Sequence, residues 1–277
     1  MPMSHQPKNL VIPTPGEPVI PFVNWGGMIA LYVKEVKRFF KVHLQTIWAP
    51  AFTTLLYLVI FTVALGRGGR EVMGHPFATF VAPGLIVMGM MNAAFANSSF
   101  SLLAGKMQGT IIDYLLPPLS TGEMLAALTG ASITRALLVG AALWAAMLFW
   151  PGVDVVPQHP LVAIWFGLMG SALLSLVGLL TSIWADKFDH AAAVQNFVVG
   201  PLSLLSGTFY SIESLHAGFR AISHANPFFY VISGFRFGFL GTSDSPVLIG
   251  AVGLFVLNIL LAWLNYALLD RGWKIKS

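Results

Sequence analysis

The sequence contains no cysteine and few charged residues. Without cysteine, neither a disulfide framework nor a thiolate metal site can form, and the redox state of the compartment is left open. Only 9% of the 277 residues are Asp, Glu, Lys or Arg, against about 25% in an ordinary soluble domain. Because 56% of the residues are hydrophobic, the chain cannot cover itself with polar groups, and we expect lipid to solvate it.

Sequence signatures of catalysis and nucleotide binding are also missing. No G-x-x-x-x-G-K-[ST] loop is present, since the glycines at 66–69 and 105–109 are not followed by Lys-Ser or Lys-Thr at the required spacing. No H-E-x-x-H pair occurs, and the seven histidines lie in tails, loops and interfacial segments. We therefore predict that the chain is not an enzyme, with no catalytic residue, no metal site and no cofactor of its own.

Long apolar runs are what the sequence has in abundance. A helix needs about 20 apolar residues to cross a hydrocarbon layer roughly 30 Å thick. Evenly spaced runs of this length predict an all-α integral membrane protein, with a six-helix transmembrane bundle within residues 46–270. The predicted spans are 47–65, 77–103, 128–150, 160–184, 191–210 and 246–268. Arg135 interrupts the third run, and we expect it to snorkel to the inner interface rather than to line a substrate path.

The two ends of the chain are predicted to be cytoplasmic tails. Residues 1–24 are rich in proline and are expected to be mostly disordered, and residues 271–277 form a short C-terminal tail. No secretory signal peptide is visible, because a basic region followed by an apolar stretch and a small-residue cleavage site is missing. The first apolar helix is therefore kept as a span.

The distribution of basic residues predicts the orientation. The net charge is +4, but Lys and Arg are scattered between apolar runs, which argues against nucleic acid as a partner. Cytoplasmic connections of membrane proteins carry an excess of Lys and Arg. A cytoplasmic N-terminus places inside Lys34, Lys37, Arg38, Lys41, Lys106, Lys187, Arg271, Lys274 and Lys276. It places outside only Arg67, Arg70, Arg220 and Arg236.

Residues 25–45 have the periodicity of an amphipathic helix. Its apolar face carries Ile29, Tyr32, Val33, Val36 and Phe40, and its basic face carries Lys34, Arg38 and Lys41. We expect this helix to lie at the membrane interface with its basic face against anionic headgroups, at about 1 kcal/mol for each Lys or Arg near the surface. The plainer alternative is a membrane anchor with no further role.

The connection at 105–122 is apolar in part although we place it on the cytoplasmic side. A short helix-like run at 111–116 is ended by Pro117 and Pro118. A docking surface for a soluble partner explains apolar residues there, and an ordinary loop dipping into the interface is the alternative. The candidate contact residues are Gly109, Thr110, Ile111, Ile112, Asp113, Tyr114 and Leu115.

The segment at 211–245, predicted to lie outside, is too long and too aromatic for a simple loop. We expect two short helices that dip into the outer leaflet and pack on the bundle, separated at Asn226-Pro227. Phe228, Phe229 and Tyr230 follow that break. They are candidates for an outer gate, with interfacial anchoring as the alternative.

Together, these stretches resemble the ABC type-2 transporter permeases. The resemblance rests on residues 32–39, 45–50, 109–120 and 226–236, in this order and spacing among the spans. It implies a homodimeric or heterodimeric bundle in a bacterial cytoplasmic (inner) membrane, driven by two copies of a cytoplasmic ATP-binding cassette ATPase that holds ATP and Mg. It also implies that 25–45 is an elbow helix, that the loop after the second span is a coupling helix, and that 211–245 forms re-entrant helices.

The function implied is export of an amphipathic, lipid, drug or glycan substrate. The alternative is an ion-coupled secondary transporter or channel without an ATPase partner. Such proteins typically carry ionisable groups near the bilayer midplane and often an inverted repeat. The predicted spans are nearly free of charge and show no repeat, which counts against ion coupling.

Overall fold

The computed structural model describes residues 22–65, 71–212 and 216–274, so most of the predicted N-terminal tail lies outside the described residues. Its α-helices are α1 (Trp25–Phe40), α2 (Ala49–Leu65), α3 (Phe77–Met107), α4 (Ile112–Leu115), α5 (Thr121–Leu148), α6 (Pro160–Trp184), α7 (Phe188–Val194), α8 (Gly200–Leu204), α9 (Ala217–Ala225), α10 (Pro227–Leu240) and α11 (Val247–Asp270). Two π-helical turns are η1 (Leu44–Trp48) and η2 (Gln195–Val199). The strands β1 (Glu71–Val72) and β2 (His75–Pro76) pair as a short antiparallel hairpin. The described chain is otherwise helical.

Five helices in the described ranges are long and apolar enough to cross a membrane. They are Leu44–Val63, Phe77–Met107, Thr121–Leu148, Pro160–Trp184 and Val247–Asp270, and each corresponds to a predicted span. The predicted span at 191–210 differs. There α7, η2 and α8 form a helical run over 188–204, about 25 Å long at about 1.5 Å per residue. The polar side chains of Gln195 and Asn196 interrupt its apolar character, and it is not among the five.

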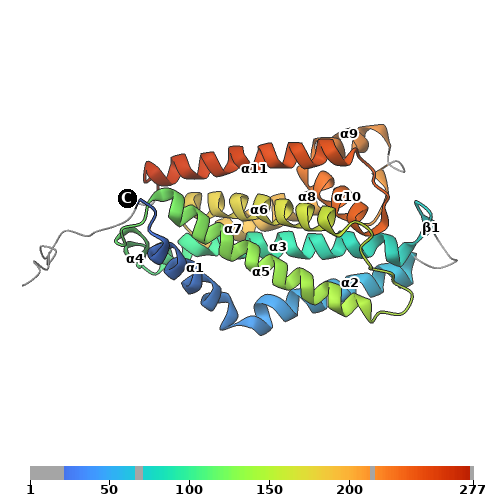
Figure 1. Ribbon diagram of the computed structural model, residues 1–277, viewed down its shortest axis with the longest axis horizontal. Helices are drawn as coiled ribbons and strands as arrows, with labels where there is room; N and C mark the ends of the chain where they lie inside the picture. The colour runs from blue at the N-terminus through green and yellow to red at the C-terminus, as the bar shows by residue number, and fades with distance from the viewer. Residues whose placement is uncertain (1–21, 66–70, 213–215, 275–277) are drawn as a thin grey trace, which may run out of the picture.

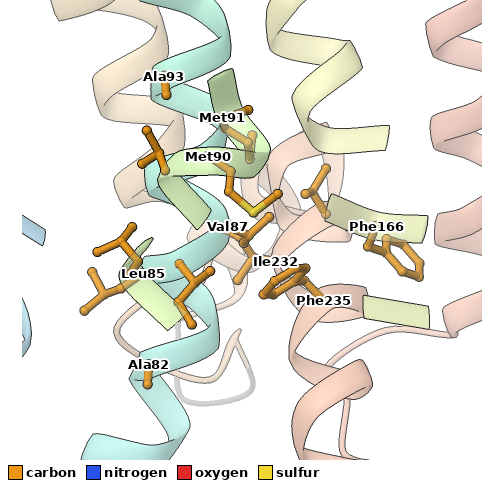
Figure 2. Close-up of a cluster of buried hydrophobic side chains, with 14 of the residues drawn as sticks. Ala82, Leu85, Val87, Met90, Met91, Ala93, Phe166, Ile232 and Phe235 are labelled. Atoms are coloured by element: carbon orange, nitrogen blue, oxygen red, sulfur yellow. The ribbon is translucent and has the colours of Figure 1, made fainter. Parts of the chain in front are cut away.

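The central helix of the bundle is α3, which packs against α2, α5, α6 and α10 (Figure 1). In its most apolar window 94% of the residues are buried, against 17% for α11, which runs along the outside. Figure 2 shows Val87 and Met90 of α3 beside Ile232 and Phe235 of α10. Because lipid tails are as apolar as these side chains, close packing rather than exclusion of water holds such helices together.

Glycines allow the inner helices to approach backbone to backbone. A Cβ atom at Gly178 of α6 would lie 2.8 Å from the carbonyl oxygen of Phe95 in α3. A Cβ atom at Gly238 of α10 would lie 2.6 Å from the backbone nitrogen of Ala163 in α6. Gly170 likewise leaves no room for a side chain against α10. Small residues in these helices therefore mark close helix packing.

A π-turn precedes a proline in two places. In η1 the Ala49 N–H donates to the Leu44 carbonyl, five residues back, and η2 has the same geometry. Pro50 and Pro201 come directly afterwards and have no N–H to offer the carbonyl four residues back. The helix continues through both prolines, and the wider turn accommodates the ring.

Candidate functional site

The bundle has two distinct ends. The start of α1, the helix α4 and the end of α11 lie at one end, which we call the α4 end, and β1 and α9 lie at the other, the α9 end (Figure 1). Most basic residues of the described chain lie in or next to α1 and near the ends of α3, α6 and α11: Lys34, Lys37, Arg38, Lys41, Lys106, Lys187, Arg271 and Lys274. From these basic residues we predicted the orientation of the chain in the membrane. The side of the membrane that each end faces stays a prediction.

The loop that carries α4 exposes apolar side chains at this end. Ile112 is 54% exposed and Leu116 is 73% exposed. Gly109 has a φ of +69°, which glycine adopts without strain, and it turns the chain from α3 towards α4. Of the predicted contact residues, those exposed are Gly109, Thr110, Ile112 and Asp113, and those packed inward are Ile111, Tyr114 and Leu115. The loop therefore has one face on the bundle and one free face.

A buried polar network joins α4 to α1 and α3. The Tyr114 hydroxyl donates to Oε1 of Glu35 at 3.0 Å. Oε2 of Glu35 accepts from the Ser101 hydroxyl and from Nη2 of Arg38, both at 2.9 Å. The same Arg38 nitrogen donates to the Asn97 carbonyl at 2.9 Å. We call these five residues the α1–α4 network.

At the centre of the α1–α4 network, both oxygens of the Glu35 carboxylate have hydrogen-bond donors. Glu35 is fully buried, and an ionised carboxylate there is stable only with a cation and hydrogen-bond donors around it. Burial and the Glu35 carboxylate raise the pKa of the Tyr114 hydroxyl above its ordinary value, so this group remains a donor at physiological pH. Loss of the Tyr114 hydroxyl or of the Arg38 guanidinium would remove a donor from this buried carboxylate. The network thus ties the position of α4 to that of α1.

The predicted basic face of 25–45 is divided between different surroundings. The Lys34 ammonium lies 3.6 Å from the centre of the Tyr114 ring, and Arg38 points into the bundle as part of the α1–α4 network. Lys41 is exposed and stays available to headgroups. The helix buries Leu31, Glu35 and Phe39, while Trp25, Ile29, Val33 and Phe40 face outward. Arg38 turns into the bundle because its ion-pair partner, Glu35, is buried.

A second ionic cluster fastens the α4 end. Asp186, in the turn after α6, lies 2.8 Å from Nζ of Lys274 and 3.9 Å from Nζ of Lys106. The hydrogen bond from Lys274 holds the pKa of the Asp186 carboxyl below its usual value. One carboxylate thereby connects the ends of α3, α6 and α11. The pairs are partly exposed, so each contributes little to stability.

An amphipathic cavity of about 500 Å³ opens beside the α1–α4 network. Two guanidinium groups, Arg38 of α1 and Arg135 of α5, line it. Nε of Arg135 donates to the carbonyl of Thr46 at 3.3 Å, and Thr46 lies four residues before Pro50. Arg135 therefore takes the carbonyl that the proline leaves without its helical partner. Arg135 points towards η1 and this cavity, and its snorkelling to the inner interface stays a prediction.

At the α9 end, α9 and α10 are the two short helices expected in 211–245. They meet at Asn226, whose side chain accepts from the Phe228 N–H and donates to the Leu202 carbonyl at 2.7 Å. Phe228 and Phe229 are buried within the bundle, while Tyr230 is half-buried and lines a cavity against α11. The outer-gate role stays a prediction, and leak measurements on a Tyr230→Ala variant would decide it.

One residue that sequence analysis assigned to an outer loop is fully buried. Arg236 forms an ion pair with Asp244 at 2.9 Å, and both side chains are 1% exposed. It also donates to the Gly207 carbonyl at 2.7 Å and stacks over the Phe80 ring. This clamp holds α10 to α3 and to the turn after α8. The signal in the sequence was a lone arginine within an aromatic, otherwise uncharged stretch.

Comparison with known proteins places this geometry in a family. Residues 27–240 match the family described as ABC-2 type transporter. The chain is 35% identical over 255 residues to the inner membrane transport permease YadH of Escherichia coli, covering 91% of this chain and 98% of the relative. It is 26% identical over 255 residues to nodulation protein J of Rhizobium leguminosarum, covering 90% and 95%. The chain therefore belongs to the ABC-2 type transporter family, as a permease subunit.

Proposed function

We propose that this chain is the membrane-spanning subunit of an ATP-driven exporter and that a separate ATPase acts on it through the α4 loop. The observation that carries the proposal is the free apolar face of that loop, backed by the α1–α4 network. The ABC-2 permease family lacks the nucleotide-binding domain, so ATP and Mg belong to the partner. An exposed Ile112 and Leu116 beside Asp113 offer the mixed apolar and polar surface typical of a protein contact.

The α1–α4 network supplies a route for coupling. A soluble ATPase that pushes on α4 displaces Tyr114, whose hydroxyl is fixed to Glu35. Glu35 is fixed in turn to Arg38 and to Ser101 of α3, the central helix. Because buried polar groups are costly to leave unpaired, the contacts favour movement of α1, α3 and α4 as one body. Motion at the α4 loop then changes the cavity that Arg38 lines.

The remaining assignments follow from this role. We propose six spans, with the run at 188–204 as the fifth, and a homodimer whose two protomers each engage one of two ATPase copies. The α4 end faces the cytoplasm of a bacterium and the protein lies in the inner membrane, as the name of the Escherichia coli relative supports. The basic residues at the α4 end support the same orientation. Family membership weighs against a secondary transporter.

Substitution of Ile112 tests the docking surface. Because Ile112 is 54% exposed, Ile112→Asp should leave the permease folded but place a carboxylate in the apolar contact. Copurification of the ATPase should weaken by about tenfold or more. The matched control is Val156→Asp, another exposed β-branched residue, near the α9 end, where binding should be unchanged. Equal ATPase binding by the wild type and Ile112→Asp would contradict the proposal.

A further inference from the structure

Arg135 is a charged residue that the coupling scheme does not use. It lies 14 positions after Thr121, the first residue of α5, or about 21 Å along a helix that is otherwise free of charge between Met124 and Leu148. A cation within an otherwise uncharged helix points to a partner. In the described ranges, Arg135 forms no ion pair with a carboxylate. Its Nε donates to the neutral carbonyl of Thr46.

The second guanidinium in the cavity is already neutralised. Arg38 is paired at 2.9 Å with Glu35, which is fully buried and does not line the cavity. The positive charge of Arg135 has no such counterpart. The cavity therefore carries an excess of one positive charge, with two guanidinium groups converging on it from α1 and α5.

The rest of the cavity wall is amphipathic. Phe100 and Phe188 stack with ring centres 5.5 Å apart and are both partly exposed, as is Val42. Polar side chains on the wall besides the arginines are Gln45, Thr46, Asn97 and Gln108. A ligand that satisfies this wall needs an anionic group for the arginines and an apolar chain for the aromatic rings.

We propose that the cavity beside Arg135 binds the phosphate group of an anionic amphiphile, and that this amphiphile is the exported cargo. Phosphate suits the site because a guanidinium donates two parallel hydrogen bonds to its oxygens. The apolar chain of the ligand lies along Phe100 and Phe188 and leaves towards lipid. The assignment of the ligand as cargo rests on the proposed export function, whereas the binding itself does not.

The test is a binding titration of the full chain in dodecyl maltoside micelles, without ATPase or ATP. Dodecyl phosphate is the amphiphilic probe, and inorganic phosphate is the second arm, each followed by calorimetry. Wild type should bind dodecyl phosphate, and inorganic phosphate should compete at least about a hundredfold more weakly, since it lacks the chain. Equal affinity for the two probes would overturn the assignment to an amphiphile. No saturable binding of either would overturn the site.

Variants locate the binding. Arg135→Gln keeps a donor for the Thr46 carbonyl but removes the charge, and it should weaken dodecyl phosphate binding by about tenfold or more. Lys41→Gln removes an exposed cation outside the cavity and should have no effect. Gln45→Glu, at an exposed position on the cavity wall, should compete for Arg135 and weaken binding while leaving the fold intact. Unchanged binding in Gln45→Glu would overturn the proposal even if Arg135→Gln did not fold.

This experiment is separate from the docking test. Absence of dodecyl phosphate binding by a wild-type chain that still binds the ATPase would refute the ligand assignment alone. Intact phosphate binding in an Ile112→Asp variant that still holds its ATPase would refute the coupling surface alone.

Discussion

At the scale of single residues, the side chains that matter most are polar groups whose partners lie far away in the sequence. Glu35 reaches Tyr114 and Ser101, and Arg135 reaches Thr46. The sequence marks such residues as unusual, because they interrupt apolar or amphipathic patterns. It does not identify their partners, since these contacts exist only once α1, α3, α4 and α5 are packed. Arg38 and Arg236 were assigned to surfaces for this reason.

Tyr114→Phe tests the coupling route at this scale. The change removes one hydroxyl that donates to the Glu35 carboxylate, a contact worth about 1.5–3 kcal/mol, and retains the ring that packs under Lys34. ATPase binding should persist because the exposed face of α4 is untouched. ATP hydrolysis stimulated by the permease should fall several-fold, measured with the purified complex in proteoliposomes.

The matched control for that experiment is Tyr32→Phe. Tyr32 lies in α1, as Glu35 does, and shares a hydrogen bond with Thr134 at 2.8 Å, outside the α1–α4 network. The Tyr32→Phe variant should lose about as much folding stability as Tyr114→Phe, but the ATP hydrolysis that the permease stimulates should be unchanged. If both variants hydrolyse ATP at the wild-type rate, the network has no part in coupling.

At the scale of elements, hydropathy predicted the spans well and their limits less well. The predicted span 160–184 coincides with α6, but α5 begins at Thr121 rather than near 128. The reason is a capping box, in which Ser120 and Glu123 satisfy each other's backbone N–H groups and start the helix within a polar stretch. That signal is present in the sequence as Ser-x-x-Glu. Hydropathy alone does not register it.

The π-turns could not be predicted in the same way. A proline in an apolar run indicates a local disturbance, but whether the helix kinks, ends or widens depends on its neighbours. At Pro50 the helix continues, and Arg135 donates to the Thr46 carbonyl that the proline leaves without a helical partner. The fifth predicted span, 191–210, is likewise divided, into α7, η2 and α8. Gln195 of η2 donates to Asn92 of α3 at 3.1 Å, a contact between helices that hydropathy does not predict.

Gly238→Ala tests whether contact between α10 and α6 holds α10 in place. The added methyl group would lie 2.6 Å from the Ala163 backbone, and overpacking of this kind costs about 1–3 kcal/mol. The unfolding temperature in detergent should fall by several degrees. Gly253→Ala is the control, because its Cβ meets no atom within 4 Å on exposed α11, and its unfolding temperature should not fall. A similar decrease in both variants would show that glycine as such, rather than the contact, is responsible.

At the scale of the whole molecule, the sequence predicted the class, the bundle and the family, and the structure added how the parts communicate. The family resemblance predicted a coupling loop at 105–122. The arrangement of that loop, α1 and the cavity around Arg38 and Arg135 depends on packing between segments up to about a hundred residues apart, which no local pattern encodes. The functional unit we propose is therefore the whole α4 end, with its docking face, its buried network and its cavity.

The central claim is that the α4 loop faces the cytoplasm and receives the ATPase, and impermeant thiol labelling tests it directly because the chain has no cysteine. Thr110→Cys lies on the exposed side of the loop, and Val156→Cys lies exposed near the α9 end. In intact cells, Val156→Cys should react and Thr110→Cys should not. In inverted vesicles, Thr110→Cys should react, and added ATPase should protect it. Labelling of Thr110→Cys in intact cells, or its failure to be protected by the ATPase, would contradict the account.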